Sequence, residues 1–159
     1  MSLDLAGLGR YLVGLTTYVE RWGVNLAQLP SLDRDPNDVI GFAIEGKLPA
    51  SGSGPGAEMI LRERWSPGAS GWERTGYAYE LIDHELASRR VFHQHDSEAF
   101  IRRFRVVVHE HCEELLGSPG CLHYAGFPIV DGYDGARRLL AIWVDPGGIS
   151  CDGLTCLET

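Results

Sequence analysis

The stretch from Glu58 to Asp83, EMILRERWSPGASGWERTGYAYELID, decides the fold class. Its first eight residues alternate in character, with Arg62 and Arg64 on one side of an extended chain and Glu63 on the other, between two apolar residues. SPGASG then offers a turn, and WERTGYAYELID alternates again, with its two YAY tyrosines on one side. Two alternating segments joined by turn residues predict an antiparallel pair of strands.

The same pattern continues on both sides of this pair. VIGFAIEGKL (Val39–Leu48) precedes it as a strand, after the polar loop Ser31–Asp38, and RRVFHQHD (Arg89–Asp96) follows it. Short alternating segments separated by turn residues are typical of a meander, so we predict an antiparallel sheet of about four strands.

Three other segments have helical spacing. Leu3–Trp22 and Gly132–Val144 carry apolar residues at three- and four-residue steps. The segment from Ser97 to Leu115 does so too, with Asp96 or Ser97 as the candidate N-cap. A β-branched run at Val106–Val108 is less favourable to a helix. We predict an α+β fold with an N-terminal helix, the antiparallel sheet and helices packed on one face of it.

Composition predicts one soluble domain. A chain of 159 residues with 44% apolar and 23% charged residues suits a single core, which we place at residues 1–145, followed by a loose tail at 146–159. The sequence has no long apolar run and no signal-peptide pattern, so we expect no membrane partner and a cytoplasmic location. The four cysteines are then expected to be reduced thiols or metal ligands.

The net charge of −8 is unevenly distributed. Residues 60–105 carry eight basic and seven acidic side chains, whereas residues 106–159 carry two basic and eight acidic ones. This distribution excludes a strongly basic nucleic-acid footprint but leaves room for a local arginine patch.

All six histidines lie between His84 and His123. A strand places His93 and His95 on one face, whereas the predicted helix separates His109 from His111 by about 200° and leaves His111 packed inside. One interpretation is metal-free acid–base chemistry on a phosphodiester, since histidine transfers protons near neutral pH and arginine stabilises negative charge. Its catalytic candidates are His93, His95, Asp96 and His109, and its substrate-binding candidates are Arg89, Arg90 and Arg102.

Two alternatives stay open. The first is a zinc-binding protein, hydrolytic or structural, because imidazole and thiolate are ligands that zinc prefers. Its candidate ligands are His93, His95, His109, Cys112 and His123. The second is a non-enzymatic interaction domain whose acidic tail binds a basic partner. In that case the histidines have structural roles, either near a helix C-terminus, where they interact favourably with the helix dipole, or in exposed turns.

The order of the central segments resembles the TumE-like family of toxins from toxin–antitoxin pairs. ILRERW followed by GYAYELID, RRVFHQHD and HEH is similar to that family's Arg-Glu strand, tyrosine-rich strand, strand ending in Asp and His-x-His. The resemblance covers about residues 58–111, with Asp131–Trp143 as the family's last helix, and matches Arg62, Glu63, Tyr77, Tyr79, Asp96, His109 and His111. It departs from the family between Asp96 and His109, where the family has a loop rich in proline and histidine.

The resemblance implies a toxin-type protein that acts on RNA and has an antitoxin protein as its partner. The overall acidic charge argues against strong nucleic-acid binding. A homodimer is a further candidate assembly, and the sequence leaves the cofactor open, with zinc as the candidate.

Overall fold

The computed structural model describes residues 2–50, 56–94, 102, 108–113, 121–124, 129–145 and 156–157. For 108–113, 121–124 and 156–157 it describes the backbone. The elements in chain order are β1 (Ser2–Leu3), α1 (Leu5–Arg21), β2 (Asn25–Leu26), β3 (Asp33–Arg34), β4 (Ile40–Leu48), β5 (Ala57–Gly68), β6 (Gly71–Asp83), β7 (Ser88–Gln94), β8 (Val108–Glu113), β9 (Cys121–Tyr124), α3 (Gly132–Val144) and β10 (Cys156–Leu157).

The strands form one antiparallel sheet in the order β10-β9-β8-β7-β6-β5-β4-β2, with β1 paired to β6 and β3 paired to β4. The long strands β4 to β7 are neighbours in the sheet as in the chain, which confirms the predicted meander and the α+β class. The sheet has more strands than the four predicted, because β8, β9 and β10 extend it beyond β7 and short strands flank β4 and β6.

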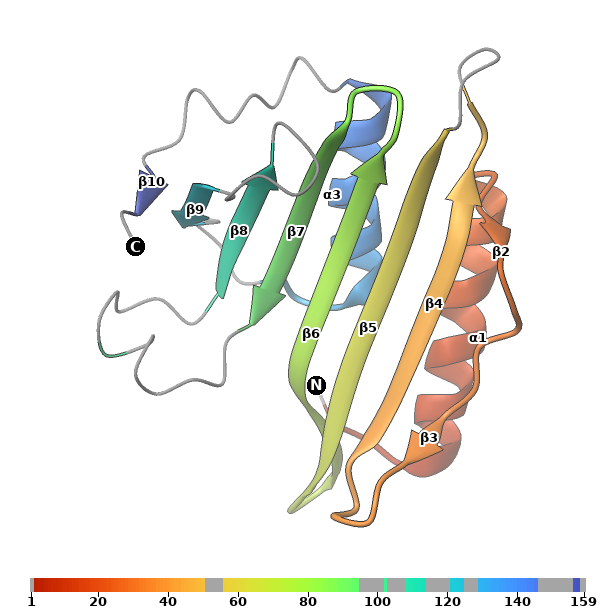
Figure 1. Cartoon of the computed structure of the whole chain (residues 1–159). Coiled ribbons are helices and arrows are strands. Elements are labelled where there is room, and N and C mark those ends of the chain that lie inside the picture. Colours follow the sequence, from red (N-terminus) through yellow and green to blue (C-terminus); the bar gives the residue numbers. More distant parts are fainter. Residues whose placement is uncertain are drawn as a thin grey trace.

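The described helices α1 and α3 pack on one face of the sheet, as predicted (Figure 1). No element that the structure describes covers the other face, which we call the open face. α1 begins at its N-cap Asp4, whose carboxylate accepts a hydrogen bond from the Gly7 amide, and α3 begins in the same way at Asp131. The core between helices and sheet contains Leu8, Leu15, Met59, Leu61, Trp65, Tyr79 and Leu139, all with 1% exposure or less.

The apolar stripe predicted for α1 is confirmed except at its ends. Leu8, Leu12 and Val19 are buried, whereas Leu5 and Trp22 are 53% and 48% exposed. Within the part of the chain that the structure describes, neither helix combines the length and apolar character needed to cross a bilayer.

The prediction of a helix through residues 108–113 was wrong. These residues form β8, which pairs with β7 along its whole length, from Arg89 opposite Glu113 to Gln94 opposite Val108. Local spacing was compatible with either structure, and the partner strand decides between them, since pairing along β7 satisfies the backbone hydrogen bonds of the segment. Arg102, the residue described between 95 and 107, is helical.

The predicted tail is described at Cys156 and Leu157, which pair as β10 with His123 and Leu122 of β9. The rest of 146–159 lies outside the described residues. The division into a domain and a tail therefore stays a prediction.

Candidate functional site

The open face of the sheet carries two histidine positions directly opposite each other. His93 of β7 pairs with Ala78 of β6 on one side and with His109 of β8 on the other. Directly opposed residues of an antiparallel pair are about 4.5–5.5 Å apart at their Cα atoms and lie on one face of the sheet. The register therefore brings together two of the four predicted catalytic residues.

The strand β8 also corrects the relation of His109 to His111. Residues two apart in a strand share a face, so position 111, opposite Val91, lies on the same open face as position 109. The prediction that the two histidines lie on different sides of a helix was wrong for this reason. That the His111 side chain is packed inside stays a prediction, because the structure describes only the backbone there. His95 and Asp96 lie outside the described residues.

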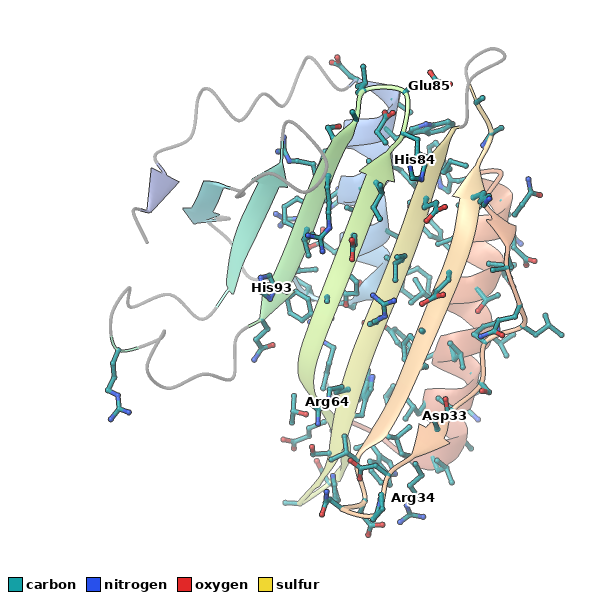
Figure 2. All side chains as sticks on the ribbon, in the orientation of Figure 1. Asp33, Arg34, Arg64, His84, Glu85 and His93 are labelled. Atoms are coloured by element: carbon teal, nitrogen blue, oxygen red, sulfur yellow. The ribbon has the colours of Figure 1, made fainter. Side chains whose placement is uncertain are left out.

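A hollow of about 510 Å³ opens on this face beside His93. Its lining includes Arg62, Arg64, Thr75, Tyr77, His93 and Gln94. Figure 2 shows Arg64 towards one end of the long strands and His93 near the end of β7.

Small residues explain why the open face is hollow here. In register across the sheet, Arg64 has Gly41 on one side and Gly76 on the other, and Arg62 has Ala43 and Ala78. A Cβ at Gly76 would meet only the Arg64 Cβ, at 3.9 Å, so packing does not require glycine there. Glycine in a strand often marks a place where a ligand or a backbone approaches closely.

The charged groups of the hollow are not equivalent. Arg62 Nη2 donates to Glu45 Oε1 at 2.7 Å, and its Nη1 lies 3.9 Å from Glu80 Oε2. Arg64 is exposed and makes no ion pair with the residues that the structure describes. Of the arginines described in the lining of the hollow, Arg64 is therefore the candidate to bind an anionic ligand.

The three arginines predicted to bind substrate lie in different places. Arg89 is on the open face, where its Nε donates to Glu80 Oε1 at 2.5 Å. Arg90 is 8% exposed and pairs in register with the buried Leu81, so it lies on the helix-covered face. Arg102 is exposed and lies outside the strands. The alternation of β7 therefore separates Arg89 from Arg90, and of these two Arg89 shares a face with His93.

The five residues of the zinc interpretation are also divided by the register. His93 and His109 occupy the open face, whereas Cys112 pairs with Arg90 and His123 pairs with Glu110, which places both positions on the helix-covered face. Among the residues whose side chains are described, no three of the His, Cys, Asp and Glu side chains gather as a metal site.

The helix-covered face holds a second polar cluster around Glu63, whose side chain is fully buried. Tyr11 Oη donates to Glu63 Oε1 at 2.8 Å, Trp65 Nε1 donates to Oε2 at 2.9 Å, and Tyr79 Oη also donates to Oε1. Arg74 Nη1 completes the cluster, 3.3 Å from Glu63 Oε1 and 2.6 Å from Tyr79 Oη. The buried carboxylate is thus matched by four donors.

This cluster fixes the start of α3 to the sheet. Arg74 Nη2 donates to the carbonyl oxygens of Ile129 and Val130 at 2.6 and 2.8 Å. The Gly132 amide donates to Tyr11 Oη at 2.7 Å. Every polar group named here is used in positioning the chain, so we assign the cluster a structural role.

The cluster also holds its tyrosines neutral. Burial, and then the negative charge of Glu63, raise the pKa of Tyr11 and of Tyr79 above the ordinary value. Burial alone would lower the pKa of Arg74, but Tyr79 and Glu63 beside it raise the pKa overall. Arg74 therefore stays charged at neutral pH.

Sequence reasoning missed Arg64, Thr75 and Gly76 as parts of the hollow. The alternation in EMILRERW does place Arg62 and Arg64 on the side away from Glu63, so that signal was present. What the sequence does not contain is the register that puts small residues beside both arginines.

Comparison with known proteins adds no assignment: no family model, no curated protein and no solved structure matches this chain.

Proposed function

We propose that the hollow on the open face binds RNA and that His93 and His109 cleave it by acid–base chemistry. The observation that carries this proposal is the placement of His93 directly opposite His109 in register, at the edge of a hollow that contains Arg64, an arginine with no ion pair among the described residues. Two histidines and a cation at one phosphate are the groups that a metal-free cleavage of RNA needs.

The reaction would proceed by transfer of two protons. One histidine, in its neutral form, accepts the proton of the ribose 2′-hydroxyl while that oxygen bonds to phosphorus. The other histidine, in its protonated form, donates a proton to the 5′-oxygen as its bond to phosphorus breaks. Arg64 offsets the negative charge that develops on the phosphoryl oxygens. The products are a cyclic phosphate and a free 5′-hydroxyl.

The proposal fits the resemblance to TumE-like toxins, and an antitoxin protein would then be the partner that restrains the activity. Since the net charge is −8, attraction to a long polyanion is weak, and a short single-stranded segment suits the hollow better than a duplex. His95 and Asp96 follow His93 in the chain and stay predicted members of the site.

The experiment measures cleavage of a labelled single-stranded RNA by the purified wild type and by His93→Gln. We expect a loss of at least about 100-fold in the rate for His93→Gln, since acid–base catalysis contributes factors of that order. His84→Gln is the matched control, because His84 lies in an exposed turn with Glu58 as its partner at 3.4 Å. Equal rates for the wild type and His93→Gln, or no cleavage by the wild type, would contradict the proposal.

A further inference from the structure

Two cysteines occupy directly opposed positions on neighbouring strands. Cys112 of β8 is the register partner of Cys121 of β9. Opposed residues of antiparallel strands have Cα atoms about 4.5 or 5.5 Å apart, according to their place in the hydrogen-bond pattern. Disulfides join residues whose Cα atoms are about 4.4–6.8 Å apart. The backbone register alone therefore meets the distance requirement of a disulfide, for either kind of opposed pair.

The same row of the sheet supplies a cation next to this pair. Arg90 of β7, a buried arginine, is the register partner of Cys112 on its other side. A guanidinium at a neighbouring position favours the thiolate, which is the form that attacks a disulfide. Cys112 is thus the candidate attacking thiol and Cys121 the candidate resolving thiol.

The other cysteines do not share this arrangement. Cys156 of β10 is the register partner of His123, and Cys151 lies outside the described residues. Cys156 therefore serves as a natural control, because it lies in the same part of the sheet without an opposed cysteine in the described strands.

We infer that Cys112 and Cys121 form a reversible cross-strand disulfide by exchange with a small disulfide such as oxidised glutathione. The Cys112 thiolate attacks one sulfur of the oxidant, so a mixed disulfide forms and one glutathione thiolate leaves. Cys121, after losing its proton to water, attacks the Cys112 sulfur, and the second glutathione thiolate leaves. The two cysteines lose two electrons in total, and the oxidant gains them.

The link would tie β9, a strand of four residues, covalently to β8. Since β8 carries position 109, the link would be attached to a strand of the proposed site itself. The inference itself stands on the register of Cys112 and Cys121, and it holds or fails whether or not the protein cleaves RNA.

The experiment incubates the folded protein with oxidised glutathione, alkylates the remaining thiols and digests with trypsin and a glutamate-specific protease. Cleavage after Glu114 separates the two cysteines, and cleavage after Arg137 removes residues 138–159, which contain the other two cysteines. We expect a peptide that contains Cys112 joined to Leu115–Arg137, while Cys156 stays alkylated. Amide hydrogen exchange in residues 121–124 should slow in the oxidised protein.

Variants and a denatured sample complete the test. Cys121→Ser should leave glutathione on Cys112 and give no internal link, and Cys156→Ser should behave as the wild type. In denaturant the preference of Cys112 for Cys121 should disappear, because strand pairing no longer holds these two cysteines opposite each other. A link between Cys121 and another cysteine in the folded protein would overturn the inference. So would zinc that remains bound through a chelator wash and is lost in Cys112→Ser, or full alkylation of both thiols after oxidation.

Discussion

Arg62 and Glu63 are consecutive residues of one strand, yet they belong to opposite faces of the sheet and to different tasks. Glu63 is fully buried and receives hydrogen bonds from three neighbouring side chains and an ion pair from Arg74. Arg62 is 48% exposed in its side chain and lies in the wall of a hollow open to solvent. The helix-covered face therefore uses charge to hold the fold, whereas the open face leaves the charged side chains of Arg62 and Arg64 exposed to solvent.

Glu63→Ala should cause the largest loss of stability of the variants that compare the two faces. Removal of the carboxylate leaves the Arg74 guanidinium buried without its ion-pair partner, so we expect a loss of about 3–5 kcal/mol in the free energy of unfolding. Urea unfolding measures it, with Arg62→Ala as the control on the other face, where an exposed pair contributes at most about 1 kcal/mol. Equal losses for the two variants would show that the faces do not differ as described.

A smaller loss should follow Gly135→Ala, which probes close packing on the helix-covered face. A Cβ at Gly135 would lie 2.3 Å from Tyr79 Cδ2, and Tyr79 is held in the Glu63 cluster. We expect overpacking to reduce the free energy of unfolding by about 1–3 kcal/mol. Gly9→Ala is the matched helical control, since nothing lies within 4 Å of its added Cβ. Alanine favours helix, so that variant should gain up to about 1 kcal/mol.

On the open face, Gly76→Leu should weaken the binding of the proposed ligand and leave the stability of the fold nearly unchanged. An added Cβ meets only ordinary contact at 3.9 Å, and the larger side chain extends into the hollow beside Arg64. We expect a change of less than about 1 kcal/mol in the free energy of unfolding, because leucine replaces a glycine inside a strand. RNA cleavage should fall at least about tenfold, which corresponds to about 1.4 kcal/mol. Loss of folding without loss of specific activity in the folded fraction would place the ligand elsewhere.

The smallest effect concerns Asp134 at the start of α3. Burial alone would raise the pKa of its carboxyl, but hydrogen bonds and charge from Arg137 and Arg138 lower the pKa overall. A carboxyl whose pKa is lower in the folded state than in the unfolded state stabilises the fold at pH values above the unfolded-state pKa. This stabilisation is lost as the pH falls through the folded-state pKa. Asp134→Asn should therefore cost about 0.5–1 kcal/mol at neutral pH. The difference from the wild type should shrink in acid, and a difference that does not depend on pH would contradict this electrostatic origin.

Much of the fold could be predicted because its signals are local. The period of Gly132–Val144 predicted α3 to the residue, and the alternation in the central stretch predicted β5 and β6 with small errors at their ends. β8 was missed because its apolar spacing fits a helix as well as a strand, and the deciding contact is the pairing with β7.

The site was predictable in part for the same reason. His93 was identified as a candidate from the end of its strand, and Arg62 and Arg64 were placed together by alternation. The neighbours of these residues come from strands that are distant in sequence, such as Gly41 on β4 and His109 on β8. Register is a non-local property, so the opposed histidines and the hollow needed the structure.

The most direct test of the account is the pH–rate profile of RNA cleavage for the wild type, His93→Gln and His109→Gln. If one histidine acts as the base and the other as the acid, the wild type gives a bell-shaped profile around neutral pH. Each variant should then lose one limb of the bell, and the two variants should lose opposite limbs. A profile whose two limbs both survive in either variant would contradict the assignment of the opposed histidines as the acid–base pair.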